Sequence, residues 1–215
     1  MQLEKHKRFL TDDFESGKAL PLLDSFYTLQ GEGYHMGKAA YFIRIGGCDI
    51  GCQYCDEKIS WSPSLHQSVP TKDIIDSVLN TPSNNLVVTG GEPCIYNLDL
   101  LCSLSHQKDI KIYLETSGAY PITGTWDWIC VSPKPQEPPI NENLEKADEL
   151  KVIIFDDDDI KWAEICAQKV SDKCELYLQP EWSRHKEKIP KIVDYIKKNP
   201  QWKISLQAHK FMKIP

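Results

Sequence analysis

Apolar residues along the chain gather in short runs that alternate with segments of helical spacing. Seven runs are typical of buried strands, at residues 40–45, 86–88, 110–114, 128–131, 152–155, 176–178 and 204–206. Segments with apolar residues three and four positions apart predict helices around residues 74–79, 100–104, 160–166 and 189–196. We expect Thr71 to cap the first of these helices. Strands and helices therefore alternate along the chain.

This alternation favours a mainly parallel sheet with crossover helices, an α/β fold. The chain has 215 residues, fewer than the ~250 of a complete barrel of eight βα units. We therefore expect a partial, open TIM-like βα barrel of about six βα units.

Polar and glycine-rich segments follow directly after the predicted strands. They are Cys48, Thr89-Gly90-Gly91-Glu92-Pro93, Glu115-Thr116-Ser117-Gly118, Ser132-Pro133-Lys134 and Gln179-Pro180. Because the loops after parallel strands converge on one face of such a barrel, this pattern predicts a single site built from many loops.

Charge and composition narrow the class of partner. The chain has 25 Lys and Arg against 31 Asp and Glu, a net charge of −6, which argues against nucleic acid as a partner. Neither a secretory signal nor a membrane span is visible in the apolar pattern. We expect a cytoplasmic protein with a small-molecule substrate, whose eight cysteines stay reduced.

Three cysteines, Cys48, Cys52 and Cys55, form a CxxxCxxC arrangement on a glycine-containing loop. Thiolates suit zinc or an iron–sulfur cluster. A [4Fe–4S] cluster held by three thiolates would leave one iron open. The alternatives are a zinc site completed by Cys94, His35 or another residue, and a redox pair of Cys52 with Cys55. The other five cysteines are most simply small buried apolar residues.

The CxxxCxxC spacing resembles that of the radical S-adenosylmethionine enzymes, in which the open iron binds the cofactor's amine and carboxylate. The segment Thr89 to Pro93 is similar to the GGEP motif with which these enzymes hold the amino group of the cofactor. Its paired glycines allow backbone groups to approach a ligand closely.

The segments around these motifs resemble the 7-carboxy-7-deazaguanine synthase family. They are residues 26–33, Gly37, residues 42–44, Cys55-Asp56, residues 87–94, Glu115 to Gly118, Val131 to Lys134, Leu178 to Pro180 and Leu206 to Phe211. The likeness begins at about residue 24. It implies one radical S-adenosylmethionine domain over residues 24–215 and an N-terminal extension over residues 1–23.

The resemblance implies a radical ring contraction of 6-carboxy-5,6,7,8-tetrahydropterin to 7-carboxy-7-deazaguanine with loss of ammonia, a step towards queuosine and other deazapurines. It also implies that S-adenosylmethionine is regenerated, that flavodoxin or ferredoxin supplies electrons, and that the enzyme is a homodimer.

Roles for individual residues follow from the same resemblance. The cluster ligands would be Cys48, Cys52 and Cys55. Contacts to S-adenosylmethionine would come from Tyr54, Cys55, Asp56, Gly91, Ser132, Pro133, Lys134, Gln179, Pro180, Glu181 and Trp182. Contacts to the pterin would come from Leu29, Gln30, Gly31, Arg44, Thr89 and Pro215.

Elementary chemistry agrees with the pterin contacts. Arg44 offers a planar fork of N–H donors to a carboxylate, although a surface ion pair is the alternative. Gln30 and Thr89 can match the donors and acceptors of a pterin edge. Glu32 either joins them or orders its loop, and we assign no chemical role to His35 or His209.

Glu57 departs from the family pattern, in which a Thr or Ser after the Cys-Asp pair often binds Mg²⁺. A carboxylate is also a good ligand for a hard cation. We therefore expect Mg²⁺ to assist, with Glu57 as a candidate ligand.

Two other functions stay open at this point. A radical activating enzyme, which acts on a glycyl residue of a partner protein, shares the cysteine spacing. A zinc-stabilised binding module would need a fourth ligand and no sulfide.

Overall fold

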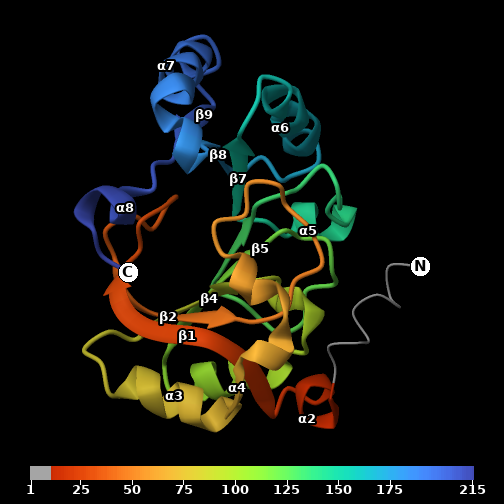
Figure 1. Cartoon of the computed structure of the whole chain (residues 1–215), viewed down its shortest axis with the longest axis vertical. Coiled ribbons are helices and arrows are strands. Elements are labelled where there is room, and N and C mark those ends of the chain that lie inside the picture. The colour runs from red at the N-terminus through yellow and green to blue at the C-terminus, as the bar shows by residue number, and fades with distance from the viewer. Residues whose placement is uncertain (1–10) are drawn as a thin grey trace.

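The computed structural model describes residues 11–215, which fold around one open, curved sheet (Figure 1). Within these residues the sheet has nine strands in the order β3-β1-β2-β4-β5-β6-β7-β8-β9. The strands are β1 Ala19–Leu29, β2 Ala39–Ile45, β3 Gln67–Pro70, β4 Asn85–Gly90, β5 Lys111–Thr116, β6 Trp128–Val131, β7 Glu149–Ile154, β8 Glu175–Pro180 and β9 Trp202–Ile204. The neighbouring strands β2, β4, β5, β6, β7, β8 and β9 pair in parallel. Strand β1 is antiparallel to both of its neighbours, β2 and β3. The expected α/β class with a mainly parallel, open sheet is confirmed.

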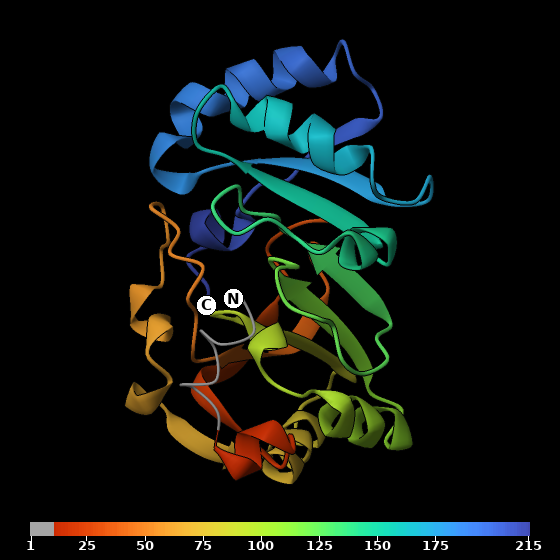
Figure 2. The ribbon, with the colours of Figure 1, turned by 90° about the vertical axis from the view of Figure 1, so that its right-hand side faces the viewer.

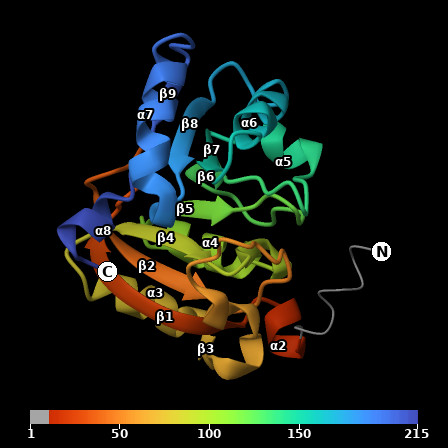
Figure 3. The same cartoon turned by 45° about the horizontal axis from the view of Figure 1, so that its top comes forward.

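Helices connect most of the parallel strands and cover the outer face of the sheet (Figure 3). They are α2 Asp12–Glu15, α3 Thr71–Leu79, α4 Asp99–Gln107, α5 Asn141–Glu145, α6 Asp159–Ala167, α7 His185–Ile196 and α8 Ala208–Met212. Short 3-10 turns lie at Lys58–Trp61, Pro63–Leu65, Pro93–Ile95 and Trp182–Arg184. The described part of the chain has no helix between β5 and β6, so the alternation of strand and helix is incomplete there. None of the described helices is long and apolar enough to cross a bilayer.

The expected cap of α3 is wrong. Thr71 is the first residue of the helix, and its buried hydroxyl donates to the carbonyl of Gly17 at 2.6 Å. The N-cap position is therefore taken by Pro70, which has no side-chain group to cap the helix.

Two strands, β1 and β3, were not expected from the sequence. Pro21 and Asp24 interrupt the apolar pattern of β1, and β3 is short and mostly exposed. Strand β1 begins at Ala19, inside the stretch expected to be an extension, and Phe14 packs edge-on against Tyr96 with ring centroids 5.7 Å apart. Residues 1–10 of that stretch lie outside the described residues.

Alternation along the strands separates the core from the site. Val88 and Leu114 are buried in the cluster packed against the helices, whereas their neighbours Thr89 and Glu115 line a cavity on the other face. Because successive side chains of a strand point to opposite faces, each strand contributes apolar groups to one side and polar groups to the other. The same alternation places Arg44, Lys151 and Gln179 on the cavity side.

Candidate active site

A cavity of about 360 Å³ lies on the face of the sheet that carries Thr89, Glu115 and Lys151. Figure 2 shows the curved sheet from a second side. Every residue to which the sequence assigns a site lines this cavity, with the exception of Pro133. Pro133 is buried, and its carbonyl accepts a hydrogen bond from the indole of Trp162 at 3.4 Å. The predicted cluster, cofactor and pterin residues therefore share one space of the size of a small-molecule site.

The cysteine loop follows β2 and has no regular secondary structure before the turn at Lys58. Its entrance is fixed by backbone hydrogen bonds from Gly47 to the carbonyl of Ser60 at 2.6 Å and from Cys48 to the carbonyl of Trp61 at 3.2 Å. Cys48, Cys52 and Cys55 are half-buried, are not in disulfides, and line the cavity. All three thiols are therefore available as ligands, on a loop whose entrance is fixed by these backbone hydrogen bonds.

The donor set fits an iron–sulfur cluster. Burial raises the pKa of the Cys48 thiol to about 12 and also raises that of Cys52. These thiols therefore need cationic partners to ionise, which bound iron supplies. In residues 11–215 no three His, Cys, Asp or Glu side chains are gathered closely enough to hold a single metal ion. A cluster has no such requirement, because each thiolate binds a different iron atom.

The GGEP segment packs directly onto the cysteine loop. A Cβ atom on Gly91 would lie 2.4 Å from the carbonyl oxygen of Gly47, so only glycine fits there. The next residue, Glu92, donates its backbone N–H to the same carbonyl at 2.9 Å. Its buried carboxylate accepts from the hydroxyl of Thr116 at 2.6 Å and from the N–H of Ser117 at 2.8 Å. The cluster loop is thereby tied to the ends of β4 and β5.

The loops after β6 and β8 form a second wall of the cavity and carry several of the groups assigned to S-adenosylmethionine. The ammonium of Lys134 donates to the hydroxyl of Ser132 at 2.7 Å, and burial lowers its pKa. Glu181 accepts from the N–H groups of Ser183 and Arg184, so its carboxylate holds the turn after β8. These contacts fix the position of both loops before any ligand binds.

Aromatic rings border the same wall. Tyr54, from the cysteine loop, stacks on Phe155 after β7 with centroids 5.5 Å apart. The ring of Trp182 stacks on His185 at 4.6 Å and meets Phe211 edge-on at 5.1 Å. These contacts join the cysteine loop and the C-terminal segment to the last third of the sheet.

Arg44 is engaged in ion pairs with acidic neighbours. It lies opposite Asp24 in the register of β1 and β2, and it donates to both carboxylate oxygens of that residue, through Nε at 2.7 Å and through Nη2. Its Nη1 lies 3.0 Å from Glu57. The hydrogen bond to Asp24 raises the pKa of Arg44 further, against the opposing effect of burial. The edge of the guanidinium with Nε and Nη2 is thus bonded to Asp24, and Nη1 is bonded to Glu57 inside the cavity.

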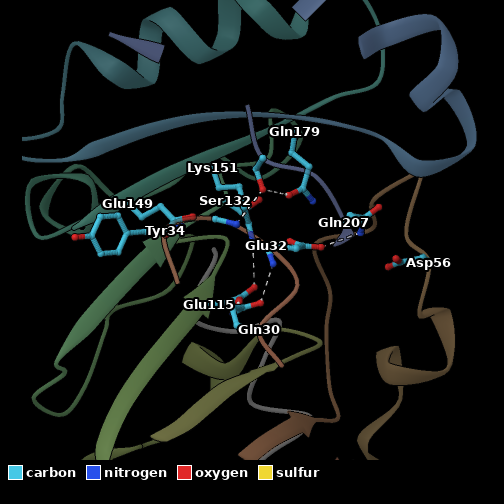
Figure 4. Close-up of polar contacts among 12 residues, drawn as sticks. Gln30, Glu32, Tyr34, Asp56, Glu115, Ser132, Glu149, Lys151, Gln179 and Gln207 are labelled. Carbon is cyan, nitrogen blue, oxygen red and sulfur yellow. Dashed lines mark hydrogen bonds and ion pairs between the residues drawn. The ribbon is translucent and has the colours of Figure 1, made fainter. Parts of the chain in front are cut away.

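A buried polar network on the cavity floor was not found from the sequence (Figure 4). Lys151 lies 2.6 Å from Glu32 and 3.2 Å from Glu115. The amide of Gln30 donates to Glu115 at 2.8 Å, and that of Gln207 donates to Glu32 at 2.9 Å. The sequence singled out the segments that hold the partners of Lys151 but not Lys151 itself, an isolated polar residue within β7 that only its alternation with buried neighbours could have revealed.

The C-terminal segment closes one side of the cavity, and α8 lies beside the end of β1 (Figure 1). The N–H of Ala208 donates to the carbonyl of Gly31 at 2.9 Å, and Lys210 forms an ion pair with Asp56 at 2.8 Å. A Cβ atom on Gly31 would lie 2.2 Å from the ring of His209, so this histidine packs directly on the loop after β1. Pro215 reaches the cavity wall.

Comparisons with known proteins agree with this geometry. A family described as "4Fe-4S single cluster domain" matches residues 29–124, which include the three cysteines. A 7-carboxy-7-deazaguanine synthase of Flavobacterium psychrophilum is 49% identical over 94% of this chain and 95% of its own length. A synthase of the same name from Synechocystis is 42% identical over 90% of this chain and 93% of its own.

The fold has a match among solved structures. The crystal structure of QueE from Escherichia coli superposes with a TM-score of 0.79 at 27% identity, covering 96% of this chain and 99% of that one. The matches in sequence and fold extend over nearly the whole chain, beyond the cysteine loop. The chain therefore belongs to the 7-carboxy-7-deazaguanine synthase family of radical S-adenosylmethionine enzymes, which work with a [4Fe–4S] cluster.

Proposed function

We propose that this enzyme converts 6-carboxy-5,6,7,8-tetrahydropterin to 7-carboxy-7-deazaguanine with release of ammonia. The observation that carries the proposal is the shared cavity, in which three free thiols, the GGEP loop and the polar groups of Gln30, Thr89 and Arg44 border one space of about 360 Å³. When bound, the [4Fe–4S] cluster and S-adenosylmethionine supply a 5′-deoxyadenosyl radical that removes a hydrogen atom from the substrate and later returns it.

The residues of the cofactor wall bind and orient the cluster and S-adenosylmethionine. Cys48, Cys52 and Cys55 ligate the cluster. S-adenosylmethionine is held by the GGEP backbone at Gly91 and by the side of the cavity that carries Tyr54, Asp56, Ser132, Pro133, Lys134 and the segment from Gln179 to Trp182. Because the loop contacts described above are already made, these groups need little rearrangement on binding.

The pterin lies against the opposite wall. Arg44 donates to the substrate carboxylate from the side of its guanidinium that faces Glu57, while Asp24 keeps the group in place. Leu29, Gln30, Gly31, Thr89 and Pro215 border the ring. Since Lys210 and Gln207 tie the C-terminal segment across this wall, bulk water is kept from the ring.

In this proposal Mg²⁺ binds to Glu57 and assists binding of the substrate carboxylate. The carboxylate of Glu57 lines the cavity but pairs with Arg44 at 3.0 Å. A cation at Glu57 would therefore compete with Arg44 for this carboxylate, and it would add positive charge to attract the substrate carboxylate. Activity that neither falls on thorough chelation nor rises with added Mg²⁺ contradicts this role.

Other assignments belong to the proposal as well. We infer a flavodoxin or ferredoxin as electron donor, a homodimer, and a cytoplasmic location, where the eight unpaired cysteines stay reduced. The radical S-adenosylmethionine domain covers residues 24–215 in this proposal, and the part of the preceding segment from Ala19 onward adds the start of β1 to its sheet.

Turnover by anaerobically reconstituted enzyme tests the function. The protein is given a reductant, S-adenosylmethionine and 6-carboxy-5,6,7,8-tetrahydropterin, and mass spectrometry follows the products with and without Mg²⁺. We expect 7-carboxy-7-deazaguanine. Formation of 5′-deoxyadenosine alone contradicts the substrate, and absence of both from protein that holds its cluster contradicts the assignment as a whole.

A further inference from the structure

Lys151 is a lysine buried on the cavity side of the sheet. It lies on β7 between Leu150 and Val152, which are buried in the core, and its side chain is only 4% exposed. Its ammonium contacts the carboxylates of Glu32 at 2.6 Å and Glu115 at 3.2 Å. One buried cation therefore serves two carboxylates from other parts of the chain.

The contacts around Lys151 join three walls of the cavity (Figure 4). Glu32 belongs to the loop after β1, Glu115 to the end of β5, and Gln207, which donates to Glu32, to the C-terminal segment. Gln30 links the Glu115 carboxylate to the loop of Glu32, because its side-chain N–H donates to Glu115 and its side-chain carbonyl accepts from the backbone N–H of Glu32 at 3.1 Å. Removing the cation would leave the two carboxylates with hydrogen bonds to neutral amides, among them those of Gln30 and Gln207.

The charge and the exposure of Glu32 and Glu115 favour a role of these carboxylates in binding a ligand. Two carboxylates and one ammonium leave one net negative charge. The side chains of Glu32 and Glu115 are 14% and 22% exposed, and both line the cavity. Each carboxylate has about four acceptor sites, more than its partners use here. The free acceptors suit a ligand edge rich in N–H donors, which a reduced pterin has on its ring and exocyclic amine.

Stability alone does not account for this lysine. Apolar residues of similar volume commonly replace a buried ion pair without loss of stability. Lys188 provides the comparison within the chain: its side chain is 2% exposed and pairs with Asp157 at 3.0 Å, but it lies outside the cavity.

The charged surroundings keep the ion pairs intact. Burial alone would raise the pKa of Glu32, but the charge and hydrogen bond of Lys151 lower it to about 2. Burial also opposes the charge on Lys151, and Glu115 and Glu32 raise its pKa well above the usual value. The other titratable groups that face this pair are Cys130 on β6, Glu149 on β7, Lys134 after β6 and His209 on α8.

We propose that Lys151 is a positioning residue for the pterin, which holds the carboxylates of Glu32 and Glu115 turned so that their free oxygens accept the N–H groups of the substrate. This inference rests on the proposed function. It makes Lys151 necessary for recognition of the pterin, and it affects S-adenosylmethionine less, although Gln179 and Lys134 lie near Glu32 and Lys151.

Kinetics of Lys151→Met test the inference, with Lys188→Met as the matched control and Lys151→Arg as the conservative variant. We expect Lys151→Met to raise the KM for the pterin about tenfold or more, as for loss of hydrogen bonds to charged groups, with a much smaller rise in the KM for S-adenosylmethionine. The acid limb of kcat/KM for the pterin moves to higher pH, because Glu32 loses the cation that lowers its pKa. Lys151→Arg recovers most of the loss, and Lys188→Met shows neither effect. Equal increases of both KM values, or an unmoved pH profile, overturn the inference.

A second variant tests the inference if Lys151→Met does not fold. In Lys151→Met/Glu32→Gln one charge of each sign is removed, so the net charge of the site is kept. We expect it to fold and still to have a raised KM for the pterin. A wild-type KM in this variant overturns the inference, since Lys151 then only neutralises Glu32. Wild-type enzyme that makes no 7-carboxy-7-deazaguanine contradicts the proposed function, which is a separate outcome.

Discussion

The carboxylate of Glu92 accepts two hydrogen bonds from Ser117, from its N–H at 2.8 Å and from its hydroxyl at 2.5 Å. These bonds connect the GGEP segment after β4 to the loop after β5, two loops that border the cavity. Further donors are the hydroxyl of Thr116 and the N–H of Cys94 at 3.0 Å. Glu92 is 1% exposed, so water could not replace its carboxylate as the acceptor for these four donors.

Glu92→Ala is therefore expected to lower the free energy of unfolding by about 3–5 kcal/mol, because it leaves several buried donors without acceptors. Urea unfolding of the metal-free protein measures this. Glu145→Ala, at an exposed position of α5, is the control and should change it by less than about 0.5 kcal/mol. A similar, small change in both variants would contradict the structural role of Glu92.

Cys52→Ala should prevent assembly of the cluster and leave the fold intact. The cysteine loop lies at the rim and is held by backbone contacts to Ser60 and Trp61, so we expect the unfolding free energy of the metal-free protein to fall by less than about 1 kcal/mol. Iron and sulfide analysis and thermal unfolding check both points. Cys166→Ala, in the core at 1% exposure, should show the opposite pattern, with full iron content and lower stability. Loss of soluble Cys52→Ala protein would indicate a structural zinc site instead.

Gly31→Ala should dislodge α8 from the cavity wall. The new Cβ atom would lie 2.2 Å from a ring nitrogen and 2.7 Å from the Cβ atom of His209, so the helix backbone itself has to move. We expect the KM for the pterin to rise about tenfold or more and the double variant Gly31→Ala/His209→Ala to recover most of this, since coupled sites are non-additive. Steady-state kinetics of the four proteins give the coupling. Additive effects would contradict direct packing of His209 on Gly31.

Arg44→Ala should weaken pterin binding much more than S-adenosylmethionine binding, by about tenfold or more, because it removes a charged donor to the substrate carboxylate. Calorimetric titration with each ligand separates the two affinities. Asp24→Asn serves as comparison, because it loosens the guanidinium and retains its charge. Equal losses for both ligands in Arg44→Ala would support the alternative, an ion pair with Asp24 and Glu57 that only stabilises the strands.

His35 should make stability depend on pH in the acid range. Its ring is stacked on Tyr113 at 4.6 Å, and neither ring nitrogen has a hydrogen-bond partner among the described residues. Burial, with the charge of Lys38, lowers its pKa to about 4, against about 6.5 in the unfolded chain. Between these values the unfolded state binds a proton that the folded state does not, so stability is present above pH ~6.5 and falls as the pH falls towards 4.

The variant His35→Phe keeps a ring of similar size and cannot be protonated. It should lose less stability than the wild type between pH 7.5 and pH 5, as measured by urea unfolding at both values. Because all other titrating groups are common to both proteins, the difference isolates His35. Equal losses would contradict a neutral, buried imidazole.

The sequence predicts the parts of the site that have local motifs. Cys48 to Cys55 and the GGEP segment are continuous in sequence, and the turns that follow the strands fix where they converge. Lys151 shares none of these properties, because its partners lie 119 and 36 residues away. Only its place between the buried Leu150 and Val152 marks it as facing the other side of a strand. Strand β1 was missed for a similar reason, since Asp24 is explained by its cross-strand partner Arg44 and not by its neighbours in sequence.

Both edges of the open sheet are guarded against pairing with another strand. At one edge β3 has four residues and ends with Pro70, which has no N–H to donate, and at the other β9 has only three residues, Trp202–Ile204. Such short edges offer little backbone to a second chain. Two copies of this enzyme would therefore associate through their side-chain surfaces, and the sheet would end within each protomer.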